Sequence, residues 1–277
     1  AYTAAVKGAF KGLPTVIGGI EASLRRLAHY DYWDNKVRRS VLVDSKADLL
    51  LFGMAETALV ALAKRMLAGE EFEAITDLRG TAYLAKTAPD TAVALPSFEK
   101  VISSTDAYNK AFKLAADEKN PFSGKALVQE HGNRQLVVNP PASPLEEEQL
   151  DRIYALPFTK LPHPYYQDVI PAYAQIKFSI TSHRGCCGGC AFCAITHHQG
   201  KTIQSRSEQS VQEELERLSL HPDFRGTVTD VGGPTANMYG MRCSNPEAQA
   251  SCRRESCLYP QICKHLDTRD DRAVALL

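Results

Sequence analysis

Three cysteines in one short loop constrain this chain more than any other feature. They are Cys186, Cys190 and Cys193, spaced C-x3-C-x2-C among several glycines. The segment before them, Gln175–Thr181, alternates polar and apolar residues and is predicted to form a β-strand. Glycines let the backbone wrap closely, so three thiolates can reach three irons of a single cubane cluster and leave its fourth iron without a protein ligand. An open metal position of this kind is typical of a reactive site.

The loop and its surroundings resemble a known superfamily. A C-x3-C-x2-C loop directly after a strand, with Phe192 between the last two cysteines, is similar to the radical S-adenosylmethionine (SAM) superfamily. The likeness covers nearly the whole chain, because further segments are similar to the YgiQ-like proteins, an uncharacterised family of radical SAM proteins. These segments are GGIEASLRRLAHYDYWDNKVRRS, DSKADLLLFGM, ITSHRGC, HHQGKTIQSRS, DVGGPTANMYG and CRRESCLYPQIC.

The resemblance implies a radical SAM enzyme of unknown substrate. In such enzymes SAM chelates the open iron of a [4Fe-4S] cluster, and one electron from the cluster cleaves SAM into methionine and a 5′-deoxyadenosyl radical. The radical then takes a hydrogen atom from the substrate. Cys186, Cys190 and Cys193 match the iron ligands of this family. A reductase, or a donor of the flavodoxin or ferredoxin type, is the implied source of the electron.

Two features downstream of the cysteines match further parts of this family. Phe192 matches the aromatic residue that lies near the adenine of SAM, and a core Phe is the alternative. The segment Glu208–Leu220 carries apolar residues on one helical face and resembles the first helix of the barrel. Either Ser207 or Ser205, the latter in a capping box with Glu208, is predicted to start this helix.

The next segment, Gly226–Gly233, resembles the second strand of the barrel. Family members commonly end this strand with G-G-E, whose backbone contacts the methionyl group of SAM. Gly232 and Gly233 stand at these positions and are therefore candidate SAM-binding residues, with a tight turn after the strand as the alternative. Pro234 departs from the motif and has no backbone N–H, so a contact here must use its carbonyl group or the flanking glycines.

The predicted fold class is α/β. The resemblance implies part of a Rossmann-like, cobalamin-binding-like domain in residues 1–84, then a connector with a hairpin and a Pro-rich linker in residues 85–170. The start of a partial TIM-like (βα) radical SAM barrel, with a cysteine-rich insertion, follows in residues 171–277. The residues after Cys193 suffice for about two βα units, so we expect a piece of a longer protein. The cobalamin motif D-x-H-x-x-G is absent from this chain, so its sequence does not support cobalamin binding.

Local patterns place several elements. Apolar runs at residues 13–17 and 47–52 each end at glycine and are predicted strands, and Glu56–Leu67 has helical spacing, which together favour βαβ units around a parallel sheet. Ala126–Glu130 and Arg134–Val138 are predicted to form a hairpin, and Glu146–Tyr154 a short helix. The charged, aromatic segment Leu24–Arg39 fits either a solvated helix and loop or an interface.

A second group of cysteines follows the loop. Cys243, Cys252, Cys257 and Cys263 could hold a second Fe–S cluster or a structural zinc ion, and the alternative is reduced thiols that share no ligand. Cys187, next to the first cluster ligand, is interpreted as a packed thiol that binds no metal.

Composition narrows the functional classes further. The 32 Lys and Arg residues balance 32 Asp and Glu residues, so nucleic-acid binding is not indicated. No apolar run approaches the roughly 18 residues of a membrane helix, and no signal peptide is visible. Clustered cysteines favour metal binding in a reducing compartment, which predicts a cytoplasmic location.

Two rival functions remain open at the level of the sequence. One is an Fe–S electron carrier or redox sensor without SAM chemistry, which would need a fourth cluster ligand from the protein. The other is a zinc-stabilised binding module, in which His197 or His198 completes a zinc knuckle with the three loop cysteines.

Overall fold

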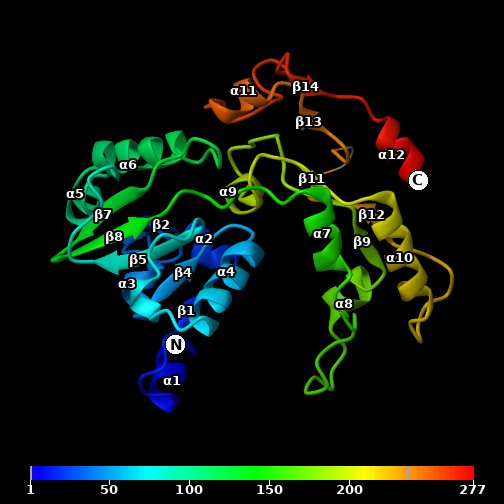
Figure 1. Ribbon diagram of the computed structural model, residues 1–277, viewed down its shortest axis with the longest axis horizontal. Coiled ribbons are helices and arrows are strands. Elements are labelled where there is room, and N and C mark those ends of the chain that lie inside the picture. The colour runs from blue at the N-terminus through cyan, green and yellow to red at the C-terminus, as the bar shows by residue number, and fades with distance from the viewer. Residues whose placement is uncertain (1, 236–237) are drawn as a thin grey trace. The chain divides into compact units, whose positions relative to one another are not determined.

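The apolar run at residues 49–51 forms an inner strand of a sheet in the computed structural model, which describes residues 2–235 and 238–277 (Figure 1). This run is strand β4 (Leu49–Leu51), and all three side chains are buried. Leu50 packs with Leu136 and its neighbours, whereas Leu49 and Leu51 pack on the other face against helix α4 (Glu56–Leu67). Because successive strand residues point to opposite faces, the sheet is covered on both sides. The predicted α/β class and the predicted helix are confirmed.

Six strands make up this sheet. In order across the sheet they are β1 (Val16–Ile17), β4, β5 (Thr81–Ala85), β8 (Arg134–Val138), β7 (Leu127–His131) and β6 (Val93–Ala94). The pairs β1–β4 and β6–β7 are parallel, and the pairs β4–β5, β5–β8 and β7–β8 are antiparallel. The sheet is therefore mixed, and the prediction of a parallel sheet is correct only for two pairs. The predicted hairpin is confirmed as β7 and β8, which a tight turn can join only when the strands run antiparallel.

The chain divides into two compact units, and the first contains this sheet. It comprises residues 1–143 together with 246–254, so the sheet crosses the predicted boundary at residue 84. The other elements of this unit are α1 (Tyr2–Ala9), α2 (Ile20–Leu24), β2 (His29–Asp31), β3 (Lys36–Arg38), α3 (Val41–Ser45), η1 (Phe72–Ala74), α5 (Phe98–Ser103), α6 (Thr105–Asp117) and α11 (Pro246–Ala250). The segment predicted as a surface helix and loop or an interface contains the antiparallel hairpin β2–β3, and Trp33 beside it is 78% exposed.

The second unit comprises residues 144–245 and 255–277. Its elements are α7 (Glu147–Tyr154), α8 (Pro171–Ile176), β9 (Ser179–Thr181), β10 (His183–Arg184), α9 (Ile195–Gln199), β11 (Gln204–Ser205), α10 (Glu208–Ser219), β12 (Asp230–Gly232), β13 (Arg242–Cys243), β14 (Leu266–Asp267) and α12 (Asp271–Leu276). The predicted strand at residues 175–181 begins only at Ser179, because Pro171 occupies the first turn of a helix that continues to Ile176.

Strands β9 and β12 pair in parallel and are joined through α10, which lies alongside them (Figure 1). Ile180 packs against Val211 and Leu218 of this helix. Of the two predicted starts of this helix, Ser207 is confirmed and Ser205 is not, because the Ser207 hydroxyl accepts a hydrogen bond from the Ser210 N–H at 3.0 Å. One βαβ unit thus stands at the position predicted for the start of the barrel. None of the helices in the described part of the chain has the length and apolar character needed to cross a membrane.

Candidate metal centre

The cysteine loop lies between β10 and α9 in the second unit. Cys186 is buried, Cys193 is half-buried and Cys190 is exposed. Gly189 has a φ of +62°, and a Cβ at this position would lie 2.5 Å from the Glu255 carbonyl oxygen. Only glycine fits both this conformation and this close approach. The loop therefore packs directly against the backbone at Glu255, which comes much later in the sequence.

Two of the three predicted ligands converge on Gly188. A Cβ on this residue would lie 3.4 Å from Cys186 Sγ and 3.7 Å from Cys190 Sγ, so both sulfurs border the space that the missing side chain leaves open. The Gly188 N–H donates to Cys186 Sγ at 3.4 Å, and hydrogen bonds of this type to sulfur tune Fe–S clusters. Cys193 belongs to the same turn, because its N–H donates to the Cys190 carbonyl at 3.0 Å.

The three thiols are the kind of donor set that an iron–sulfur cluster with one open iron uses. In residues 2–235 and 238–277, no group of three or more Cys, His, Asp or Glu side chains has an arrangement that would hold a metal ion. Neither the three-cysteine site nor a zinc knuckle with His197 or His198 is therefore preformed in the described part of the chain. Three thiols on one glycine-rich loop remain the chemistry that an Fe–S cluster requires.

Cys187 is packed away from the surface. It is 2% exposed and forms a small apolar cluster with Cys186 and Met238. Burial, together with the nearby thiols of Cys257 and Cys186, raises the pKa of Cys187 to about 11, so it stays protonated at neutral pH. A protonated, enclosed thiol is a poor metal ligand, which agrees with its interpretation as a packed residue.

Phe192 and the glycine pair occupy different environments. Phe192 is 92% exposed, which contradicts the alternative of a core Phe and leaves its ring accessible to a ligand. Gly232 ends strand β12, and its carbonyl accepts a hydrogen bond from the Ser182 N–H at 2.6 Å. Gly233 follows at the carboxyl ends of the parallel pair, the edge at which barrels and α/β sheets bind ligands. Ala236 and Asn237 of the same motif lie outside the described residues.

His183, to which the sequence motifs assign no role, lies against Gly233. A Cβ on Gly233 would come within 2.6 Å of Cδ2 of the His183 ring and closer still to Cε1 and Nε2. His183 is 1% exposed, and its Nδ1 lies 3.1 Å from the Ser182 hydroxyl. Burial lowers the pKa of His183, an effect that the Thr235 backbone partly offsets, so the ring is neutral at pH 7. A histidine between a strand and the first cysteine was the only signal in the sequence.

Arg206 is a second residue that the sequence analysis missed. It is fully buried, donates to the Thr181 carbonyl at 2.8 Å and forms an ion pair with Glu214. Its guanidinium also stacks on the Tyr154 ring at 4.2 Å and bonds the Ser210 hydroxyl. Arg206 therefore ties the end of β9, just before the cysteine loop, to helix α10.

The second cysteine group is divided between the units. Cys243 lies on β13 opposite Leu266 of β14, and the Cys263 N–H donates to the Cys257 carbonyl at 2.7 Å. Cys257 in turn donates its N–H to the Cys187 carbonyl at 2.9 Å, so this segment is bonded to the first cysteine loop. Cys252 falls in the first unit. The structure thus links Cys243, Cys257 and Cys263 through backbone contacts without forming a metal site in the described residues.

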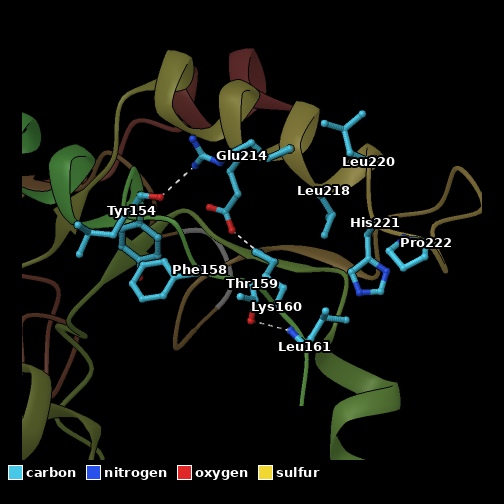
Figure 2. A pocket seen from close by; sticks show the side chains of 12 residues that line it. Tyr154, Phe158, Thr159, Lys160, Leu161, Glu214, Leu218, Leu220, His221 and Pro222 are labelled. Atoms are coloured by element: carbon cyan, nitrogen blue, oxygen red, sulfur yellow. Dashed lines mark hydrogen bonds and ion pairs between the residues drawn. The ribbon is translucent and has the colours of Figure 1, made fainter. Parts of the chain in front are cut away.

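A pocket of about 210 Å³ lies elsewhere in the second unit, between residues 154–161 and the end of α10 (Figure 2). Lys160 pairs with Glu214 in this pocket, and Arg217 donates to the Tyr154 carbonyl at 3.0 Å. Lys160, Glu214 and Arg217 therefore already have partners, and no cysteine of the described chain lines the pocket.

Fold and loop together define an α/β protein in which the parallel pair β9–β12 is followed, after β9 and β10, by a C-x3-C-x2-C loop. A family model described as Radical SAM N-terminal matches residues 1–179, and the chain belongs to this family. The matched region ends before Cys186, so the assignment of the loop cysteines rests on the motif itself.

Relatives agree with this membership and with the resemblance to YgiQ-like proteins. The chain is 56% identical over 279 residues to a UPF0313 protein of Geobacter sulfurreducens, which covers 100% of the chain and 46% of the relative. It is 48% identical to a UPF0313 protein of Methanocella arvoryzae, with coverage of 100% and 46%, and 42% identical to UPF0313 protein YgiQ of Escherichia coli, with coverage of 99% and 45%. The chain therefore spans about half the length of the curated relatives it matches.

One solved structure shows a distant likeness. It is the radical SAM methyltransferase TsrM from Kitasatospora setae with a tryptophan substrate and a SAM analogue bound. The TM-score is 0.42 at 16% identity, over 90% of this chain and 33% of that one, and we draw no argument from it.

Proposed function

We propose that the protein containing this chain is a radical SAM enzyme with a [4Fe-4S] cluster on Cys186, Cys190 and Cys193. When bound, the cluster and SAM supply a 5′-deoxyadenosyl radical, which takes a hydrogen atom from a substrate that these residues do not identify. The observation that carries the proposal is the convergence of Cys186 and Cys190 on the open space at Gly188, with Cys193 in the same turn. Three cysteine ligands leave one iron for SAM.

The surrounding residues support binding of SAM beside the loop. The exposed ring of Phe192 is available to stack on adenine, and the backbone of Gly232 and Gly233 lies at the ligand-binding edge of the strand pair. Pro234 has no N–H, so we assign hydrogen-bond donation on this segment to the glycines.

The proposed chemistry needs an external electron and a reducing compartment. A reductase, or a donor of the flavodoxin or ferredoxin type, would supply the electron, and Cys190, one of the residues that would hold the cluster, is exposed. Eight cysteines that form no disulfide suit the reducing cytoplasm, which we propose as the location.

The later cysteines are a candidate second metal site. Cys243, Cys257 and Cys263 belong to one hydrogen-bonded segment, and either an Fe–S cluster or a zinc ion suits three or four thiols. Metal analysis separates these choices, because a second [4Fe-4S] cluster doubles the iron content per chain whereas a structural zinc adds zinc alone.

Electron paramagnetic resonance of the full-length protein tests the main proposal. The protein is purified anaerobically, reconstituted with iron and sulfide, and reduced, and its spectrum is recorded with and without SAM while release of 5′-deoxyadenosine is followed. We expect SAM to change the cluster signal and 5′-deoxyadenosine to form. A cluster that ignores SAM would instead favour the electron carrier, and a colourless protein containing zinc but no iron would favour the zinc-stabilised module.

A variant pair locates the cluster. Cys190→Ala is expected to lose most of the iron and the cluster signal. Cys187→Ala is the matched control in the same loop, and it should retain both because its thiol is buried and protonated.

A further inference from the structure

The cysteine loop is the connection of an antiparallel hairpin, formed by β10 and β11. Arg184 pairs with Gln204 where the loop begins and ends. Gly185 follows Arg184 with a φ of +86°, and a Cβ at this position would collide with the Thr202 carbonyl oxygen. Cys186, the first proposed cluster ligand, comes directly after this tight neck. A displacement of Arg184 therefore also moves Cys186, because the neck has little room to absorb it.

One aromatic ring contacts both ends of this hairpin. The Tyr154 hydroxyl, at the end of α7, accepts a hydrogen bond from Arg184 Nε at 3.1 Å, and the Arg184 guanidinium lies 5.1 Å from the ring centroid. Arg206, directly after β11, lies 4.2 Å from the centroid of the same ring. Both guanidinium distances are within the roughly 6 Å range of a cation–π interaction. Tyr154 thus connects the strand that enters the loop with the residue after the strand that leaves it.

Arg206 is a firm support for the Tyr154 ring. It is fully buried, forms an ion pair with Glu214 and donates to the Thr181 carbonyl at 2.8 Å. These contacts do not involve Tyr154, so they hold Arg206 in place independently of it. The ring therefore rests on a fixed neighbour and restricts where Arg184 can lie.

The segment around α7 is itself bonded to the end of the hairpin. The Leu145 N–H donates to Gln204 Oε1 at 2.7 Å, and the Ser207 N–H donates to Asp151 Oδ1 at 3.0 Å. Both bonds reach β11 or the residues just after it. The contact between Tyr154 and Arg184 extends this support to β10, the strand that enters the loop.

We propose that Tyr154 is a positioning residue for the cluster: it holds Arg184, and through Gly185 it holds Cys186 in the place from which the cysteine binds iron. This inference rests on the proposed function, because that function assigns the cluster to Cys186. Tyr154 acts through Arg184 and is not itself a ligand.

The test measures how fast a chelator removes iron from the reconstituted full-length protein. Tyr154→Leu removes the ring and the hydroxyl, and we expect iron release about tenfold faster than in the wild type, as for the loss of one cation–π contact of ordinary strength. Tyr154→Phe keeps the ring and loses only the hydroxyl, so its rate should stay within about threefold of the wild type.

Arg217→Met is the matched control. Arg217 donates to the backbone carbonyl of Tyr154 at 3.0 Å, so this variant removes a contact from the same end of α7 and leaves the ring in place. Its iron release should stay within about threefold of the wild type. The electron paramagnetic resonance signal of the reduced cluster is a second readout, which should change in Tyr154→Leu but not in Tyr154→Phe or Arg217→Met.

Arg184→Met removes the other partner of the contact. It should release iron about as fast as Tyr154→Leu, and combining the two substitutions should add little, because both remove the same interaction. If Tyr154→Leu takes up no iron, Arg184→Met decides the question alone.

Three results would overturn the inference. Iron release in Tyr154→Leu or in Arg184→Met equal to that of the wild type would exclude a positioning role. Equally fast release in Arg217→Met and Tyr154→Leu would show a general loosening of α7 instead. A wild-type protein that binds no cluster would reject the proposed function itself, and this outcome is recognised before any variant is made.

Discussion

The contact between Gly233 and His183 makes a quantitative prediction about stability. In Gly233→Ala the new methyl group would collide with three atoms of the His183 ring. The ring cannot swing away, because His183 is 1% exposed and is held through Ser182. Gly233 is not among the glycines with positive φ, so the cost arises from crowding and not from backbone strain. Overpacking of this kind costs about 1–3 kcal/mol.

The neighbouring glycine is the control for this prediction. A Cβ on Gly232 would meet nothing within 4 Å, so Gly232→Ala should change stability by less than about 0.5 kcal/mol. Because the chain has two units, native-state hydrogen exchange of β9 and β12 is a better assay than global unfolding. The free energy of local opening should fall in Gly233→Ala only.

A double variant tests whether the penalty of Gly233→Ala comes from the His183 ring. Replacing His183 by Ala removes the ring, so adding Gly233→Ala to His183→Ala should cost less than about 0.5 kcal/mol. If Gly233→Ala and Gly232→Ala lower the opening free energy equally, or if the penalty persists without the ring, the explanation by crowding is refuted.

Three further predictions concern other parts of the chain. Cys187→Ala should preserve the iron-to-protein ratio measured after reconstitution, and loss of iron would make Cys187 a ligand. Arg206→Met should destabilise the second unit by about 3 kcal/mol, measured by hydrogen exchange of α10, because it leaves buried Glu214 without one of its two cationic partners. Burial depresses the pKa of His131 to about 4 in the folded protein against 6.5 ordinarily, so the unfolded chain takes up a proton first. The free energy of unfolding of the first unit should therefore keep its full value above pH 6.5 and fall by about 2–3 kcal/mol towards pH 4. His131→Phe should flatten this pH dependence in urea titrations. If His131→Phe shows the same pH dependence of unfolding as the wild type, His131 is not its source.

Elements with a local cause were predictable from the sequence. The helix at residues 56–67 follows from apolar spacing, the hairpin of β7 and β8 from two alternating runs across a glycine turn, and the start of α10 from the hydroxyl of Ser207. Each of these elements depends on residues that are close together in the chain, so the local sequence pattern is sufficient to predict it.

Pairings between distant segments were not predictable in the same way. Strand β5 lies between β4 and β8, and its antiparallel direction depends on connections that periodicity does not describe. The sequence likewise marks Gly233 as a candidate for SAM binding but does not reveal that a ring three residues before the first cysteine occupies the space of its side chain. Arg206 was overlooked for a similar reason, because charged residues are usually exposed and only its partners Thr181, Ser210 and Glu214 explain its burial.

The bonds from residues 255–257 to the cysteine loop bear on the order in which the protein matures. Gly189 rests against the Glu255 backbone, and the Cys187 carbonyl is paired with the Cys257 N–H. During synthesis the loop therefore leaves the ribosome well before the backbone that shapes it. We expect iron and sulfide to be inserted after translation has passed Cys257, and a nascent chain halted before Glu255 to hold its three thiols too loosely to retain a cluster.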